Sequence, residues 1–242
     1  MSRLALLAAA AFALSACNRT PADDKVFGER VHAYLMAHPE VIQEAAEKLQ
    51  QKQEADAGAA LAKAAAKLPQ YRAAVERDPR DFVANPGGKI TVTEFYDYRC
   101  PHCANAAPKV LALIQANPDV RFVFKEMPIF GPTSEHAARA ALAVKQDGGD
   151  YLGLYQAYMS THGLDDDAID RLALTKGAKA ATLSSPSAQA QANAQMADIE
   201  HLFRDLSLGG TPAFIVGDQI IPGEDIDAVL QGINKQRAKL GG

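Results

Sequence analysis

An apolar segment that runs directly into two closely spaced cysteines constrains this sequence more than any other feature. Residues 90–98 are rich in β-branched and aromatic side chains, as a buried strand is. A Cys-Pro-His-Cys motif follows at residues 100–103, and residues 104–115 have the apolar spacing of a helix. The cysteines are therefore expected on the first helical turn, where the missing N–H of Pro101 costs nothing.

This placement predicts a redox-active dithiol. Unpaired N–H groups and the positive end of the helix dipole stabilise a thiolate at Cys100, so the pKa of this thiol should fall. Cys103 lies three residues further on and can close or resolve a disulfide with Cys100. His102 adds a donor that favours the reduced thiolate and makes the disulfide more oxidising. We expect Cys100 to be the more acidic and more exposed thiol.

Two structural roles and one binding role compete with a redox role for this motif. A zinc site needs about four ligands, and the sequence holds no second Cys-x-x-Cys or His-x-x-His pair. A static disulfide would close too short a loop to restrict the unfolded chain much. The competing function is a binding module in which the thiolates hold copper(I) or another soft metal. Methionine ligands would be expected beside copper, whereas Met127, Met159 and Met196 are scattered along the chain.

The residues around the motif resemble DsbA-like thioredoxin-fold proteins. Residues 94–103 are similar to their active-site segment, including its Pro-His dipeptide, and residues 125–135 and 210–214 are similar to later segments. Residues 38–42 resemble the N-terminal region of the suppressor-of-copper-sensitivity C (ScsC) branch. The resemblance implies an α/β thioredoxin fold with a helical insertion. It also implies a thiol-disulfide oxidoreductase without a cofactor, which acts on exported polypeptides and is reset by a membrane redox partner.

The same resemblance implies roles for four further residues. Glu94 corresponds to the buried acid beneath the second cysteine, and Lys125 on the neighbouring strand is expected to compensate its charge. Thr211-Pro212 matches the cis-proline loop that faces the dithiol, where the backbone before proline pairs with the substrate. The residues alone leave other meanings open, because Glu94 suits an ordinary polar strand position and Pro212 suits a sheet edge.

The first residues predict export and a lipid anchor. A short basic start precedes an apolar run, residues 4–14, that is too short to span a bilayer, as in a secretion signal. Leu14-Ser15-Ala16-Cys17 matches the bacterial lipobox, in which the cysteine is acylated; the alternative is ordinary cleavage with a chance cysteine. We expect a signal peptide at 1–16, a tether at 17–25 and a periplasmic protein on the outer membrane, which Asn18 favours. Disulfides form and persist in that compartment.

The remaining sequence predicts two parts. Residues 26–70 are expected to form a helical segment and spacer, interrupted at Pro39. Its apolar stripe either packs on the domain or associates with other copies, and the ScsC resemblance implies a homo-oligomer, favouring a trimer. The stripe comprises Val31, Leu35, Ile42, Ala45, Ala46 and Leu49. Residues 71–242 are expected to form the thioredoxin domain, with the helical insertion at about 133–206.

Charge and strand pattern add two expectations. The net charge is −4 and no basic cluster appears, so nucleic acid is excluded as a partner. Residues 120–124 are expected to return parallel to the active-site strand as a βαβ unit. Residues 211–221 have the form of a hairpin with a two-residue turn at Gly217-Asp218. The direction of catalysis stays open, because Pro-His favours an oxidase whereas an oligomer favours an isomerase.

Overall fold

The structure, a computed structural model, describes residues 21–241. The expected signal peptide and Cys17 lie outside the described residues. The chain divides into two compact units at the boundary between Ala57 and Gly58, and each unit is described by itself. Within residues 21–241, no helix is both long enough and apolar enough to cross a membrane.

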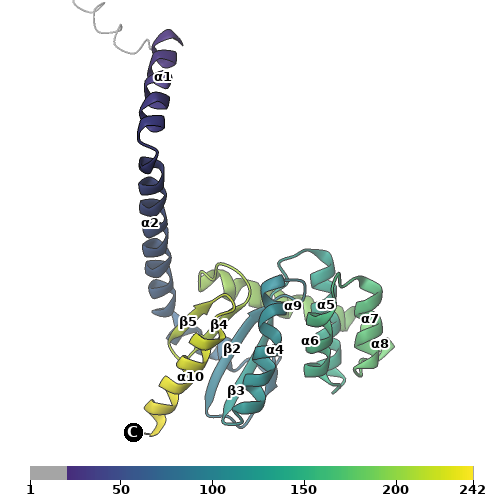
Figure 1. The fold of residues 1–242 in the computed structure, drawn as a ribbon. Helices are drawn as coiled ribbons and strands as arrows, with labels where there is room; N and C mark the ends of the chain where they lie inside the picture. The colour runs from purple at the N-terminus through teal and green to yellow at the C-terminus, as the bar shows by residue number, and fades with distance from the viewer. Residues whose placement is uncertain (1–20, 242) are drawn as a thin grey trace, which may run out of the picture. The chain divides into compact units, whose positions relative to one another are not determined.

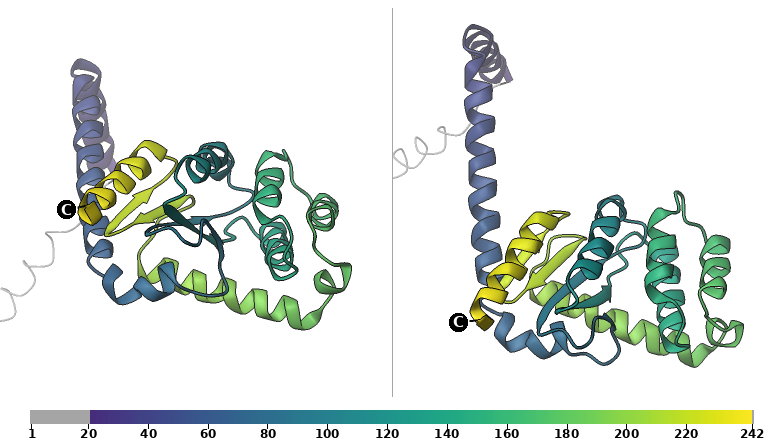
Figure 2. Two further views of the ribbon diagram at one scale, coloured as in Figure 1. Left: turned by 90° about the horizontal axis from the view of Figure 1, so that it is seen from below. Right: turned by 60° about the horizontal axis from the view of Figure 1, so that its bottom comes forward.

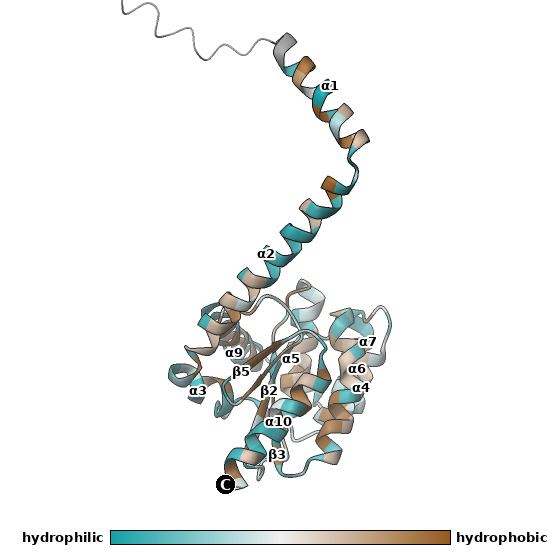
Figure 3. Ribbon diagram, turned by 60° about the vertical axis from the view of Figure 1, so that its left-hand side comes forward, coloured by the Kyte–Doolittle hydropathy of each residue, from teal (hydrophilic) through white to brown (hydrophobic). Residues whose placement is uncertain are grey.

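The N-terminal unit is helical and leaves its apolar side chains exposed. It contains α1 (Pro21–Ala37) and most of α2 (Glu40–Ala65), which are separated at Pro39 as expected, because proline cannot continue the helical hydrogen bonds. Figure 3 shows apolar positions along α1 and the start of α2, followed by a hydrophilic stretch of α2. Seven large apolar residues are exposed here: Val26, Phe27, Val31, Tyr34, Met36, Ile42 and Leu49.

The C-terminal unit is built on a five-stranded sheet with the strand order β1-β3-β2-β4-β5 (Figure 1). The strands are β1 (Phe82–Ala84), β2 (Ile90–Tyr96), β3 (Val120–Glu126), β4 (Ala213–Val216) and β5 (Gln219–Pro222). β2 and β3 are parallel and are joined by α4 (Pro101–Ala116), so the expected βαβ unit is confirmed. The expected hairpin of β4 and β5 is also confirmed, and Gly217 supplies the left-handed backbone conformation of its turn.

Helices cover both faces of this sheet. α4 and α10 (Ile226–Gly241) lie on one face, whereas α3 (Leu68–Glu76) and α9 (Pro186–Asp205) lie on the other (Figure 2). Side chains alternate along β2, so Val92 and Tyr96 join the core beneath α4, and Phe95 joins the core beneath α9. The same alternation decides on which face each polar residue of the central strands lies.

The helical insertion lies between β3 and β4, as expected. It comprises α5 (Pro132–Gln146), α6 (Tyr151–Ser160), α7 (Asp166–Thr175), the single turn α8 (Ala180–Leu183) and α9. α6 contacts α4 and buries Tyr151, Tyr155 and Tyr158 against the end of β2. The insertion therefore places a layer of tyrosines next to the segment that carries the dithiol.

Candidate active site

The dithiol lies at the junction of β2 and α4, where the sequence pattern predicts it. β2 ends at Tyr96, Cys100 is the N-cap residue of α4, and Pro101 occupies the first helical position. Cys103 lies on the same first turn. Both cysteines are free thiols in this structure.

Asp97 fixes the three-residue turn that precedes Cys100, a role that was not predicted from the sequence. Its buried carboxylate accepts hydrogen bonds from the Arg99 backbone N–H (2.7 Å) and the Ser134 hydroxyl (2.8 Å). It also accepts from the backbone N–H groups of Ile129 (2.6 Å) and Phe130 (3.0 Å). The bond two residues onward is a common turn signal of aspartate, but the partners more than 30 residues away leave no local signal.

Hydrogen bonds to sulfur make Cys100 acidic. The Cys103 thiol lowers the pKa of Cys100 most, and the Thr211 hydroxyl and the backbone N–H groups of residues 102–103 lower it further. Burial raises this pKa, but the hydrogen-bond donors outweigh burial and bring it to about 5. The buried Thr211 hydroxyl oxygen has no hydrogen-bond partner in this structure, in which Cys100 is a thiol that donates to the Thr211 carbonyl. It is therefore free to donate to a thiolate at Cys100.

Cys103 has the opposite character. Burial in the core, reinforced by the hydrogen bond to Cys100, raises the pKa of Cys103 well above the ordinary range of a thiol. The expected order of acidity is thus present. Cys100 is 2% exposed and Cys103 is fully buried, so Cys100 is the more exposed thiol, as expected. Both thiols are nevertheless buried, and the loop before β4 contacts Cys100.

That loop contains the cis peptide bond between Thr211 and Pro212, as the resemblance implied. The Thr211 carbonyl oxygen lies 3.2 Å from Cys100 Sγ and accepts its hydrogen bond. The Pro212 carbonyl accepts from the Gly223 N–H, which ties the loop to the far end of β5. The loop therefore presents a backbone acceptor directly at the reactive sulfur.

Glu94 lies beneath the dithiol on the α4 face of β2. It is fully buried, and the Tyr155 hydroxyl donates to its two carboxyl oxygens at 3.1 and 3.3 Å. Burial raises the pKa of Glu94 to about 8 against the opposing effect of the Tyr155 bond. Its charge also acts on Cys103, whose pKa it raises. Glu94 is thus a proton-holding group close to the less acidic thiol.

Lys125 does not compensate the charge of Glu94, and this expectation is wrong. The parallel register aligns Glu94 with Phe124 and Phe95 with Lys125. Because alternate side chains point to opposite faces, Lys125 lies on the α9 side of the sheet. There its Nζ binds Asp81 Oδ2 at 2.5 Å, in a pair that is buried on both sides.

His102 supplies a backbone donor to the dithiol, and its side chain reaches towards Glu224. Its side chain is 68% exposed, and its Nδ1 lies 3.3 Å from Glu224 Oε1. The ring is not among the groups that lower the pKa of Cys100, whereas the backbone N–H of His102 is one of them. The backbone of His102 thus helps to stabilise the Cys100 thiolate, and the effect of its ring stays a prediction.

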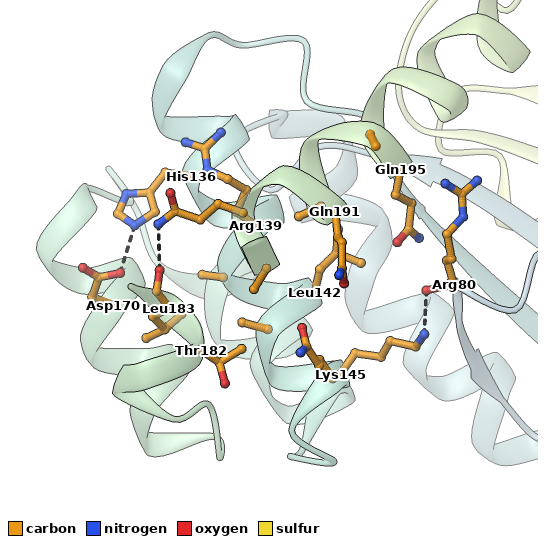
Figure 4. Close-up of a pocket in the computed structure, with 17 residues that line it drawn as sticks. Arg80, His136, Arg139, Leu142, Lys145, Asp170, Thr182, Leu183, Gln191 and Gln195 are labelled. Carbon is orange, nitrogen blue, oxygen red and sulfur yellow. Dashed lines mark hydrogen bonds and ion pairs between the residues drawn. The ribbon is translucent and has the colours of Figure 1, made fainter. Parts of the chain in front are cut away.

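A separate cavity of about 490 Å³ lies within the helical insertion, between α5 and α9 (Figure 4). Arg80, Arg139 and Lys145 are among its lining residues, and no residue of the dithiol or of the cis-proline loop lines it. Lys145 donates to the backbone carbonyls of Pro79 and Arg80. The cavity is therefore distinct from the redox site. Across residues 21–241, no group of three or more histidine, cysteine or acidic side chains is placed to hold a metal ion.

The hydrogen bond from Cys103 predicts how substitutions will change the acidity of Cys100. Cys103→Ala removes this donor, so the pKa of Cys100 should rise from about 5 towards the free-thiol value of about 8.5. Cys103→Ser keeps a donor at the same position and should give a smaller rise. Thiolate absorbance near 240 nm, recorded against pH, measures both values. Equal pKa values in the two variants would contradict a role for the Cys103 donor.

Known proteins share both parts of this architecture. The sequence pattern described as the DSBA-like thioredoxin domain matches residues 91–233, and that of the copper resistance protein ScsC N-terminal domain matches residues 24–56. A linker-deletion mutant of ScsC from Proteus mirabilis has 26% sequence identity and a TM-score of 0.66, over 93% of this chain and 100% of that chain. The thiol-disulfide exchange protein α-DsbA2 from Wolbachia pipientis also has 26% identity and a TM-score of 0.66, over 72% and 95% of the two chains.

A curated relative matches over a shorter region. The Na⁺/H⁺ antiporter NhaA 3 of Salinispora tropica is 37% identical over 75 residues, which make up 29% of this chain and only 12% of the antiporter. The family match over residues 91–233, by contrast, covers more than half of the chain and includes the dithiol, β2, β3 and the cis-proline loop. This chain therefore belongs to the DsbA-like thioredoxin family, and its N-terminal segment matches the ScsC N-terminal domain.

Proposed function

We propose that this protein exchanges thiols and disulfides in polypeptide substrates, with Cys100 as the nucleophile and Cys103 as the resolving thiol. The observation that carries the proposal is the acidic Cys100 sulfur at the start of α4, 3.2 Å from the Thr211 carbonyl. The DsbA-like family, to which the chain belongs, consists generally of thiol-disulfide oxidoreductases. A thiolate is the attacking species in such exchange.

The reaction proceeds through a mixed disulfide. The Cys100 thiolate attacks one sulfur of a substrate disulfide, forms a Cys100–substrate disulfide and releases the other substrate sulfur as a thiolate, which takes up a proton. Cys103 then loses its proton and attacks Cys100, which forms the Cys100–Cys103 disulfide and frees the second substrate thiol. Run in reverse, the same steps pass a disulfide to the substrate.

Glu94 supports the second step. Cys103 is a poor thiolate former because it is buried, so its proton needs a nearby acceptor. With a pKa near 8, Glu94 is partly ionised at neutral pH and takes up a proton readily. We propose that it accepts the proton of Cys103 during resolution and returns it when the dithiol is reduced.

The surface beside the dithiol suits an extended polypeptide. Once a substrate sulfur has replaced the thiol proton of Cys100, the Thr211 carbonyl is free to accept a backbone N–H of the bound chain, as in strand addition. Ile129 and Phe130 are 44% and 47% exposed on the segment that Asp97 ties to the dithiol turn. Exposed apolar residues at this position favour substrates that are not yet folded.

The exposed apolar side chains of α1 and α2 support self-association. The ScsC N-terminal domain pattern covers residues 24–56, which include Val26, Ile42 and Leu49. We propose that copies of this segment associate through the apolar stripe into an oligomer, for which we favour a trimer. Several dithiols around one substrate raise the local thiol concentration, so the assembly acts as an isomerase on wrongly paired disulfides.

We also propose that Cys17 carries lipid and holds the protein in the periplasm, preferentially on the outer membrane, where a membrane redox partner resets the dithiol. The support is the lipobox Leu14-Ser15-Ala16-Cys17 after an apolar run. The N-terminal peptide isolated from the native host should show by mass spectrometry an acylated Cys17 as its first residue. An unmodified Cys17, or cleavage at another position, would refute the anchor.

Trapping tests the proposed exchange directly. Cys103→Ala removes the resolving thiol, so Cys100 should accumulate as a mixed disulfide with an unfolded substrate that contains disulfides. The adduct should appear on a nonreducing gel, disappear after reduction, and be absent from Cys100→Ala/Cys103→Ala. If Cys103→Ala gives no more adduct than the double variant, Cys100 is not the nucleophile.

Substitution of the stripe tests the isomerase assembly. Ile42→Gln/Leu49→Gln should convert the oligomer to a monomer, since two buried apolar side chains at an interface contribute about 1.5–3 kcal/mol each. Glu44→Gln/Lys48→Gln makes the same number of changes on the opposite face of α2 and should leave the oligomer intact. Light scattering measures the mass of both variants.

The stripe variant should still oxidise a dithiol peptide, which needs one active site, and should lose most of its ability to refold a scrambled protein. A monomeric wild-type protein would leave a plain oxidase as the better account.

A further inference from the structure

Glu126 is a second buried acid on the same sheet face as Glu94, and the reaction described above does not use it. It is the last residue of β3 and pairs in register with Tyr96 of β2. Its side chain is 1% exposed, and the Tyr151 hydroxyl donates to Oε1. Its other carboxyl oxygen, Oε2, is buried and has no hydrogen-bond partner.

Buried tyrosines connect Glu126 to the surroundings of the dithiol. The hydroxyl of Tyr96 lies 2.7 Å from that of Tyr151 and 3.0 Å from that of Tyr98, two residues before Cys100. The rings of Tyr96 and Tyr98 pack on Tyr155 with centroid distances of 5.2 and 6.3 Å. Because Tyr155 binds Glu94, the two acids belong to one buried cluster with the dithiol.

No cationic side chain is bonded to Glu126 among the described residues that surround it. β2 contributes Glu94 and Tyr96 to this face, the turn after it contributes Tyr98, and α6 contributes Tyr151 and Tyr155. Asp81, near β1, opposes ionisation of Glu126, whereas Lys125 favours it. These two side chains are bonded to each other on the other face of the sheet. Burial raises the pKa of Glu126 to about 7, against the opposing effect of the Tyr151 bond.

A buried carboxyl with one unpaired oxygen destabilises a fold, because that oxygen has lost its bonds to water and gained none in the protein. A carboxyl that gains or loses its proton as the charge nearby changes is instead a useful group. The charge that changes nearby is that of Cys100, which is a thiolate in the reduced protein and neutral in the disulfide.

We propose that Glu126 is a positioning residue for the redox equilibrium: it holds a proton while Cys100 is a thiolate and releases that proton when the Cys100–Cys103 disulfide forms. The inference rests on the proposed exchange reaction. The tyrosine-lined cluster keeps water from Glu126, so the two negative charges interact through the interior of the protein.

The reaction balances with this proton. Two glutathione molecules deliver two electrons and two protons to the Cys100–Cys103 disulfide and leave as one glutathione disulfide. Cys103 keeps one proton and Cys100 stays ionised, so the second proton goes to Glu126 or to solvent. Because the thiolate repels a carboxylate, Glu126 ionises at a higher pH in the reduced protein than in the oxidised protein. Between these two values, reduction places the proton on Glu126.

The sign of the effect follows. At low pH Glu126 is neutral in both states and does not alter the equilibrium. At higher pH its charge opposes the Cys100 thiolate, so the reduced state is disfavoured. Glu126 therefore makes the disulfide less oxidising as the pH rises through the range in which it ionises. Glu94 remains in every variant below, so its contribution cancels in the comparison.

The test is the equilibrium of the full chain with glutathione between pH 5.5 and 8, read by acid quenching and alkylation of free thiols. Wild type and Glu126→Gln should have the same reduction equilibrium constant at pH 5.5. At pH 8 the variant should be more oxidising by roughly threefold or more, because it lacks the negative charge that opposes the Cys100 thiolate. Glu135→Gln removes an exposed acid on α5 and should follow wild type throughout.

Tyr151→Phe provides a second variant that keeps Glu126. It removes the hydroxyl that favours the ionised form of Glu126, so Glu126 should ionise at a higher pH. The step, which is the pH range over which the equilibrium constant of a protein with Glu126 falls below that of its Glu126→Gln counterpart, should therefore move to higher pH. Adding Glu126→Gln to Tyr151→Phe should abolish the step. A purely structural role would shift all pH values equally. If Glu126→Gln does not fold, the comparison of Tyr151→Phe with wild type decides the question: the two equilibrium constants should agree at pH 5.5, and Tyr151→Phe should be the more oxidising only over the pH range in which Glu126 ionises.

The two failures are distinguishable. A wild-type dithiol that does not equilibrate with glutathione would remove the proposed function itself. Wild type that equilibrates, with a pH curve parallel to that of Glu126→Gln, would overturn only the role of Glu126. An unmoved step in Tyr151→Phe would overturn it as well.

Discussion

The ionised sulfur of Cys100 is the element on which the rest of the site depends. The groups that lower its pKa are the Cys103 thiol and backbone N–H groups on the first turn of α4, and the side-chain hydroxyl of Thr211 on a loop more than 100 residues away. The remaining architecture brings these donors together. The βαβ unit sets the helix start at the end of β2, Asp97 ties the turn to the segment after β3, and the hairpin of β4 and β5 presents the cis-proline loop.

The two faces of the sheet solve different electrostatic problems. Beneath α4 and α6 the fold buries Glu94 and Glu126 among tyrosines and gives neither a bonded cation, so burial raises the pKa values of both carboxyls to about 8 and about 7. On the α9 side, Lys125 and Asp81 form a closed ion pair, to which Gln195 adds a hydrogen bond at 3.3 Å. Lys125 and Glu126 are neighbours in β3, and because alternate side chains point to opposite faces, one lies in the ion pair and the other among the tyrosines.

Local patterns were enough to place the dithiol, and distant partners were not. The strand, the cysteine spacing and the following helix lie within about 25 residues, so the sequence predicts the N-cap position of Cys100 and the βαβ unit. The resemblance to a known family supplied the cis-proline loop. The register of β2 and β3 rules out Lys125 as the partner of Glu94, and contact with a distant loop buries Cys100 although it stands at a helix start. Both depend on pairings that a single sequence does not reveal.

The same distance in sequence explains what was missed. β1 has only three residues, too few to show the alternation of apolar and polar side chains that predicts a strand. Its antiparallel pairing with β3 defines it. Tyr96 and Tyr151 are 55 residues apart, so the tyrosine cluster around Glu126 leaves no motif. Its members are individually ordinary core aromatics. Only their mutual hydrogen bonds, together with the unpaired oxygen of Glu126, distinguish the cluster from packing.

The stability difference between the reduced and oxidised protein tests the central claim most directly. The folded pKa of Cys100, about 5, lies below the unfolded value of about 8.5, so its contribution to the reduced form is complete above the unfolded value and is lost as the pH falls to 5. Urea unfolding of both forms should therefore show the reduced protein to be the more stable at pH 7, with an advantage that shrinks steadily towards pH 5. An oxidised protein that is the more stable at pH 7, or a difference independent of pH, would contradict the account.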